Sequence, residues 1–288
     1  MKGKRLQIVA AILCVLVIFM ITPGAAPSDQ PSTVDSGVLR QISSMLTEAQ
    51  PLVDGVHDVI EWEIKDSADA QAAIDKGEYP EDTSVEARAQ ISDLKGYVTQ
   101  LKALKTSADA LPSTGSDNEK MTVAAAQYYF AQLVDSAENL ESVFDYYMGV
   151  IDGLDPITNF DPPEITTGLY DYSLLAGQIS MAVAQSQTNI GKLQPPRYIS
   201  EAHQDLLREL EHFQSFSQDF SIAVQLNDPL RIASCNNRLD RLDLTIDKCL
   251  DNLQEDIDLE FTHTKSQLNG AVKTLHNELV SNIDLLLS

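Results

Sequence analysis

Basic residues are scarce in this chain of 288 residues, which has 20 Lys and Arg but 43 Asp and Glu and a formal net charge of −23 at pH 7. Three of the basic residues, Lys2, Lys4 and Arg5, lie in residues 1–28, which hold no acid. The rest of the chain is therefore strongly acidic, and its surface repels phosphate backbones and anionic lipid headgroups. We expect no nucleic-acid partner, and membrane contact only through the N-terminal segment. A cationic or protein partner fits the charge, and solubility outside the cell explains it most simply.

Cysteine is rare as well, with only Cys14, Cys235 and Cys249 in the chain. The latter two lie on one predicted helix, 14 residues apart, which corresponds to about 21 Å of helical rise. A disulfide needs Cα atoms about 4.4–6.8 Å apart. Cys235 and Cys249 therefore cannot bridge each other, and we expect buried thiols or links to a second chain.

Familiar catalytic signatures are absent. The sequence contains no G-x-S-x-G, H-E-x-x-H, P-loop, G-x-G-x-x-G or Cys-x-x-Cys pattern. The strict apolar–polar alternation of half-buried strands is also absent. We therefore predict a helical protein that is not an enzyme and binds no cofactor.

One long apolar run is present, at the N-terminus. The basic residues 1–5 precede 14 uninterrupted apolar residues at 8–21. That length corresponds to about 21 Å of helix, which is short for a hydrocarbon core of about 30 Å. Residues 1–28 are therefore predicted to be a signal peptide or an N-terminal membrane anchor, with the length favouring the signal peptide, followed by a linker at 29–34. The expected location is extracytoplasmic, either secreted or anchored to the membrane by this segment.

Proline divides the rest of the chain into stretches with a 3.6-residue apolar period. A first helix keeps one apolar face through Pro51 and is expected to be kinked there. The other prolines beyond residue 50 are expected between helices. The predicted helices are 35–75, 83–110, 118–151, 164–193, 198–226 and one from Asp228 onward.

The last helix has an apolar stripe from Ile232 to Leu286 with coiled-coil-like spacing. Unbroken, it would reach about 90 Å, and Asn269-Gly270 is the only expected stop. The fifth helix covers about half of it. The other half needs a fold-back at Asn269-Gly270, coverage by residues 35–151, or a second copy of the chain. A homodimer through the C-terminal helix is therefore one of three possible ways of covering the second half of the stripe.

The predicted fold class is all-α, an antiparallel bundle of about six long helices with a long coiled-coil-like C-terminal helix. Residues 35–151 form an N-terminal helical half and residues 164–288 a C-terminal half. The segment 152–163, rich in Gly and Pro, is predicted to be the linker between the halves.

Two Glu-x-x-His patterns are candidates for a transition-metal site, Glu209 with His212 and Glu260 with His263. Three residues of helix place both side chains on one face, as in ferritin-like di-metal proteins. Here the patterns fall on consecutive helices and no inward Glu pair accompanies them. We therefore favour solvated helix faces and predict no metal site.

His203 and the aromatic residues lie on predicted apolar faces. His203 is interpreted as a structural histidine that is hydrogen-bonded across the bundle. On the third helix, Met121, Tyr128 and Phe144 are predicted to point inward. Aromatic residues on the third and fifth helices can form core or line a pocket for an apolar ligand.

Residues 192–210 read Lys-Leu-Gln-Pro-Pro-Arg-Tyr-Ile-Ser-Glu-Ala-His-Gln-Asp-Leu-Leu-Arg-Glu-Leu. This hairpin resembles one found in bacterial and archaeal surface proteins and lipoproteins of unknown function. The resemblance implies a helical bundle at the cell surface. Those proteins carry a lipid-acceptor cysteine, whereas Cys14 lies inside the apolar run.

The expected function is that of an exported, non-enzymatic helical protein, a cell-surface binding or scaffolding module. One alternative is an extracytoplasmic bundle that binds a small ligand or solute, or acts as a sensor. Another is a metal-carrying helical bundle.

Export can be tested with the N-terminal segment alone. Residues 1–34 fused to a reporter that is active only outside the cytoplasm should give activity, because a basic segment precedes an apolar run. The same fusion with residues 8–21 deleted is the control. An inactive fusion would contradict the prediction of export.

Overall fold

The computed structural model describes residues 36–78, 83–113, 115–160 and 169–288. The signal peptide or anchor predicted at 1–28 and the linker at 29–34 lie outside these residues. Every regular element in the described part of the chain is helical. The predicted all-α fold class is therefore confirmed.

The helices follow the predicted ranges closely at most ends. Their bounds are α2 Ser36–Asp75, α3 Ser84–Asp109, α4 Asp117–Thr158, α5 Leu169–Ile190, α6 Ser200–Gln225, α7 Pro229–Gln267, the π-helical turn η1 Leu268–Val272, and α8 Lys273–Leu287.

Local capping fixes two of the helix starts. The Ser116 hydroxyl accepts a hydrogen bond from the Glu119 backbone N–H, and the Glu119 carboxylate accepts one from the Ser116 N–H, which is a capping box. At the start of α7, Asp228 accepts hydrogen bonds from the N–H groups of Leu230 and Arg231, with Pro229 in the first turn. Both starts are stabilised by residues that the sequence places there.

Two prolines lie inside helices. Pro51 lies in α2, as predicted, but Pro156 lies in the last turn of α4. The linker predicted at 152–163 is therefore wrong over residues 152–158, which are helical. Gly153 and Leu154 are buried there, and a Cβ on Gly153 would lie 2.5 Å from the Ile190 side chain. This packing against α5 keeps the last turn helical although proline removes one hydrogen bond.

A ladder of ion pairs aligns α3 with α4. Its members step by seven residues in opposite directions along the two helices, so they lie on one edge of an antiparallel pair. Each exposed pair contributes at most about 1 kcal/mol, so the ladder specifies register more than stability. The pairs are Arg88 with Asp152, Lys95 with Asp145 and Lys102 with Glu138.

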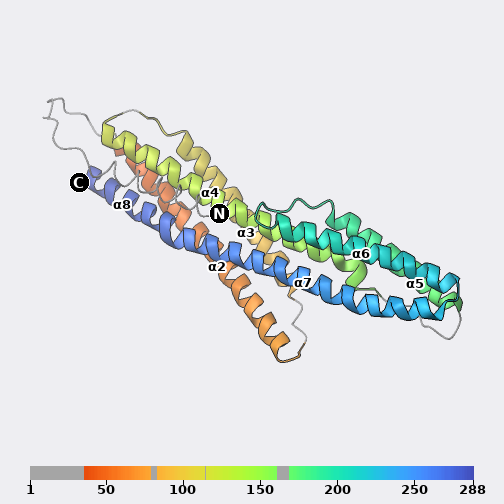
Figure 1. Cartoon of the computed structure of the whole chain (residues 1–288). Coiled ribbons are helices and arrows are strands. Elements are labelled where there is room, and N and C mark those ends of the chain that lie inside the picture. The colour runs from red at the N-terminus through yellow and green to blue at the C-terminus, as the bar shows by residue number, and fades with distance from the viewer. Residues whose placement is uncertain (1–35, 79–82, 114, 161–168) are drawn as a thin grey trace, which may run out of the picture. The chain divides into compact units, whose positions relative to one another are not determined.

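The long helices α4 and α7 together run from one end of the described region to the other, and the remaining helices pack on them (Figure 1). Toward one end, α4 packs with α2, α3, η1 and α8; toward the other, α5 contacts α4 and α6, and α6 contacts α7. Buried residues of both predicted halves belong to one hydrophobic core. Residues 35–288 therefore form a single compact unit.

The helices α7, η1 and α8 follow one another without a break, so the stop expected at Asn269-Gly270 is wrong. The two residues lie instead in the π-helical turn, which adds a residue to the helix without ending it. Leu268 and Val272 in this turn are buried. The stripe is covered by α2 and α4, which is the coverage by residues 35–151 weighed above (Figure 1).

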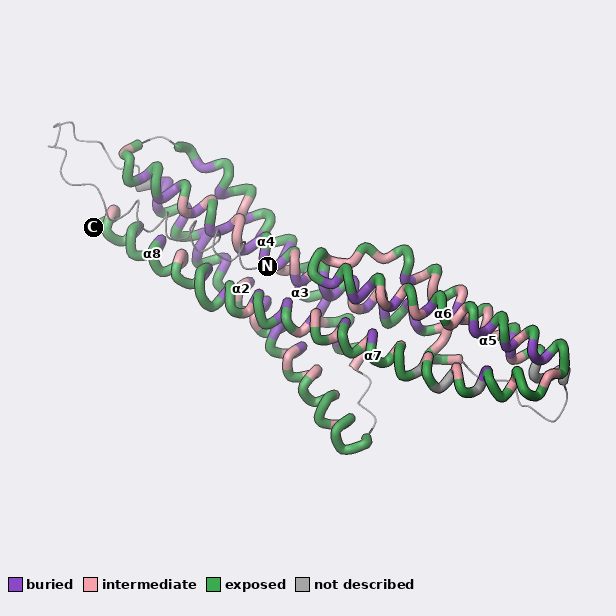
Figure 2. The backbone as a smooth tube through the Cα atoms, in the orientation of Figure 1, coloured by how far each residue is buried: buried purple, intermediate pink, exposed green. Residues whose placement is uncertain are grey.

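Burial follows the inner faces of the helices (Figure 2). On α4 the predicted stripe is wrong at two positions, because Met121 and Tyr128 are 45% and 54% exposed. Tyr129 and Phe130, each within two positions of Tyr128, are buried instead. Phe144 is buried as predicted, and its ring meets Phe261 edge to face with centroids 4.7 Å apart.

The contact between Phe144 and Phe261 is expected to be central to stability. Phe261→Ala removes a ring that is 1% exposed and should lower the free energy of unfolding by about 3–5 kcal/mol. Urea denaturation of residues 35–288 measures this. Leu259→Ala is the matched control, because Leu259 is 61% exposed on the same helix and should cost under about 0.5 kcal/mol. Equal losses would contradict the packing described.

Candidate functional site

The two Glu-x-x-His patterns lie on α6 and α7, and each has its own local partners. Glu209 Oε2 lies 3.1 Å from His212 Nδ1. Glu260 is buried and accepts a hydrogen bond from the Asn139 amide on α4. His263 is exposed, with its Nε2 3.0 Å from Gln267 Nε2.

The structure does not bring the two patterns together. Cys249 on α7 lies at the level of Glu209, since both Glu209 and Asp205 act on its thiol. Glu260 lies 11 residues further along α7, which corresponds to about 16 Å. No group of three or more His, Cys, Asp or Glu within the described ranges is placed to hold a metal ion.

Two tyrosine–histidine pairs tie α4 to other helices. Tyr146 Oη lies 3.0 Å from His203 Nδ1 on α6, and Tyr129 Oη lies 3.3 Å from His276 Nδ1 on α8. Burial lowers the pKa of both histidines, because it disfavours the charged imidazolium. His203 is therefore buried and paired, as predicted, and His276 has a similar partner that sequence reasoning missed.

The thiols of Cys235 and Cys249 are buried. Burial raises the pKa of both thiols, since the thiolate is disfavoured away from water. The charged groups that act on them from α6 are Asp219 at Cys235 and Asp205, Arg208 and Glu209 at Cys249, and those from α7 itself are Arg238 and Lys248. Both sulfurs therefore lie at the contact with α6, where a second chain has no access while the bundle is intact.

A buried acid, Glu63, lies where α2 meets α7. Its side chain is only 4% exposed, and burial raises its pKa from the ordinary 4.5 to about 7. The charges of Asp66 and Asp258 contribute in the same direction. Glu63 therefore holds a proton close to neutral pH.

Hydrogen-bond donors around Glu63 are directed at its two acidic neighbours. Ser67 Oγ donates to Asp258 at 3.2 Å, and Gln254 Nε2 donates to the same carboxylate at 2.9 Å. Thr83 Oγ1 donates to Asp66 at 2.9 Å. These donors are therefore engaged by the two aspartates that lie beside Glu63.

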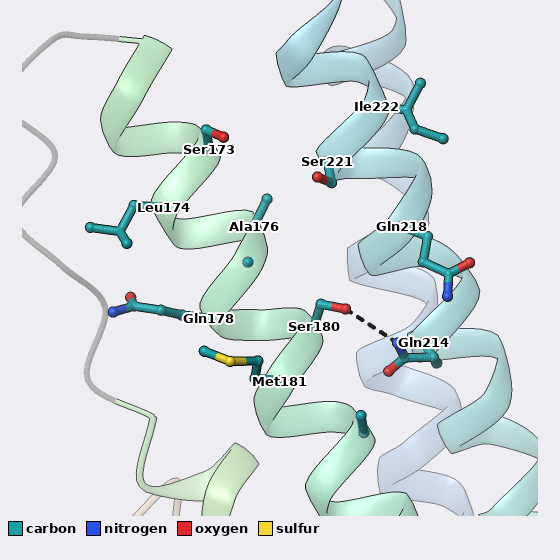
Figure 3. A pocket seen from close by; sticks show the side chains of 12 residues that line it. Ser173, Leu174, Ala176, Gln178, Ser180, Met181, Gln214, Gln218, Ser221 and Ile222 are labelled. Atoms are coloured by element: carbon teal, nitrogen blue, oxygen red, sulfur yellow. Dashed lines mark hydrogen bonds between the residues drawn. The ribbon is translucent and has the colours of Figure 1, made fainter.

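An open groove of about 800 Å³ lies between α5 and α6 (Figure 3). Small residues line α5 along the side toward α6, and longer side chains stand on both flanks. The lining residues are Ser173, Leu174, Ala176, Gly177, Gln178, Ser180, Met181 and Ala184 of α5 and Gln214, Gln218, Ser221 and Ile222 of α6.

The groove combines apolar surface with unpartnered acceptors. Gln214 Nε2 donates to Ser180 Oγ at 3.2 Å (Figure 3). The side-chain carbonyl oxygens of Gln178 and Gln214 are buried and have no hydrogen-bond partner. A buried acceptor without a donor costs about 1–3 kcal/mol. The surface of the groove therefore suits an uncharged, largely apolar partner, while the two buried oxygens lie beneath that surface.

This groove was not predicted from the sequence. The aromatic residues considered for a pocket are mostly packed inside; Phe216 and Phe220 form a small core with Ala176 and Cys235. A signal for the groove was nevertheless present, because residues 172–190 carry no charge in a strongly acidic chain. An uncharged helix in such a chain indicates a surface that water does not fully solvate.

Comparisons with known proteins leave the groove and the fold without a counterpart: no family model, curated protein or solved structure matches this chain. The resemblance of residues 192–210 to surface-protein hairpins stays a prediction. In the described part of the chain, no helix is long and apolar enough to cross a membrane.

Glu63 is expected to make stability depend on pH. Its pKa is higher in the folded state, so its contribution is complete below about pH 4.5, falls as the pH rises to about 7, and is lost above that. Glu63→Gln should therefore match the native chain near pH 5 and be up to about 3 kcal/mol more stable at pH 8.

Urea unfolding of residues 35–288 at the two pH values measures this difference. Asp69→Asn on the same helix is the control, because Asp69 is exposed. A Glu63→Gln variant with the same pH profile as the native chain would show that Glu63 is not a buried acid.

Proposed function

We propose that this protein is an exported, non-enzymatic helical binding module. Its binding surface lies far from the start of α2, where the N-terminal segment joins the bundle. The observation that carries the proposal is the position of the α5–α6 groove relative to the start of α2. The N-terminal sequence supports export, and the groove supplies the binding surface.

The start of α2 lies beside the end of α8. Ser43 of α2 and Asp284 of α8 line one hollow of about 510 Å³. The groove lies toward the opposite end, because Asp219 in the groove-bearing part of α6 pairs with Arg238 near the start of α7. From Arg238 to Asp284 the nearly straight helix rises about 70 Å.

The acidic exterior is consistent with a module that stands off an anionic surface. The chain carries a net charge of −23, and the ion pairs of the described region leave most acids without a basic partner. Such a surface is repelled by anionic lipid headgroups within the Debye length of about 8–10 Å. A membrane-attached chain would therefore contact the bilayer chiefly through its N-terminal segment.

A second candidate function is the binding of an uncharged small ligand. The volume of the groove is within the range of small-ligand sites, about 300–1,000 Å³. The openness of the groove to solvent favours a macromolecular partner over an enclosed small molecule.

The orientation can be tested with two matched labels. Leu230 and Leu285 are 82% and 74% exposed and lie near opposite ends of the α7–η1–α8 helix. Cysteine at each position in the full chain, labelled with a donor dye, should report distance from a membrane that carries an acceptor. Quenching should be stronger at residue 285, because α8 ends beside the start of α2.

Removal of residues 1–34 is the control and should abolish quenching at both positions. Recovery of the chain in the medium would identify a secreted module. Stronger quenching at residue 230, or a chain found only in the cytoplasm, would contradict the proposal.

A further inference from the structure

We propose that the α5–α6 groove is a dimer interface, in which α5 of one chain packs against α5 of a second copy about a two-fold axis. The inference rests on the proposed function, because it names the partner of the same groove. It differs from the homodimer expected through the C-terminal helix, whose apolar stripe is covered by α2 and α4.

The distribution of charge favours this surface over the rest of the molecule as a contact between two copies. Two copies that each carry a net charge of −23 repel one another at most orientations. Residues 172–190 carry no charge, and Asp219 of α6 is paired with Arg238 on the α7 side. The α5 side of the groove is therefore a place where two copies can approach without bringing like charges together, whereas the exposed Glu211 lies on α6 one turn before Gln214.

Shape supports a helix as the occupant. Ala176, Gly177 and Ser180 lie along the groove, and a Cβ on Gly177 would meet nothing within 4 Å. Leu174 and Met181 stand on the flank of α5 and are 43% and 67% exposed (Figure 3). One helix thus supplies both projecting apolar side chains and a shallow surface to receive them, as a two-fold interface requires.

The available area is that of a small dimer interface. The exposed residues of α5 run from Ser173 to Thr188, which corresponds to about 24 Å of helix, and two adjacent helices present a face about 20 Å wide. Each copy can therefore bury about 500 Å², or about 1,000 Å² in total, which is the lower limit for a specific interface.

The test fills the groove at Gly177. Residues 35–288 form one compact unit, so light scattering of this segment at micromolar concentrations should give twice the chain mass. Gly177→Leu should raise the dissociation constant roughly 100-fold or more, while the thermal unfolding temperature is unchanged or higher, since glycine is a poor helix former. Gly96→Leu on α3 is the matched control, because its added Cβ also meets nothing within 4 Å, and it should remain a dimer.

A second variant keeps the test valid if Gly177→Leu does not fold. Met181→Glu places a charge on a side chain that is 67% exposed, so it leaves the monomer intact and should also dissociate the dimer. A native segment that is monomeric at all these concentrations overturns the proposal. So does a dimer that survives both groove variants, or one that Gly96→Leu disrupts equally.

A monomeric segment that binds an uncharged apolar fluorescent probe, and loses it in Gly177→Leu, would assign the groove to a small ligand and also overturn the dimer. Failure of dimerisation is distinguishable from failure of the proposed function. Export and orientation are measured independently, by the reporter fusion and the membrane-acceptor labels.

Discussion

The antiparallel packing of α4 against the uninterrupted α7–η1–α8 helix is the contact on which the rest of the described structure depends. Phe144 meets Phe261, Asn139 hydrogen-bonds to Glu260, and Tyr129 lies beside His276 along this one seam. The α7–η1–α8 helix is longer than any of its neighbours, so different helices pack on it toward its two ends. A π-helical turn at Leu268–Val272 keeps the inward face continuous past Gly270.

The buried histidines and the buried Glu63 change the stability of the fold in opposite directions as the pH changes. His203 and His276 have pKa values lowered by burial, so acid destabilises the folded chain as they gain protons. Glu63 has a raised pKa, so its contribution to stability is lost as the pH rises from about 4.5 to about 7 and the carboxylate forms. The buried histidines and the buried acid therefore oppose one another as the pH changes.

The end formed by α5, α6 and the start of α7 differs from the end formed by α2, α3, α4 and α8. Ion pairs from α3 to α4 and from α2 to α7 line the latter, as with Glu61 and Lys265. The α5 helix instead presents Leu174 and Met181 to solvent and carries no charge after Asp171. Most of the molecular surface is thus acidic and repels anionic surfaces, whereas the exposed face of α5 is uncharged.

The sequence by itself determined the fold class, the helix boundaries to within a few residues at most ends, and the burial of His203. These features follow from local physics: apolar period, capping residues such as Ser116 and Asp228, and the exclusion of proline from most helix interiors. Only the tertiary structure decided that Pro156 stays helical, that Met121 and Tyr128 face outward, that α2 and α4 cover the C-terminal stripe, and that α5 and α6 leave a groove. Each of these depends on which neighbour packs against a helix, and several neighbours satisfy the same local pattern equally well.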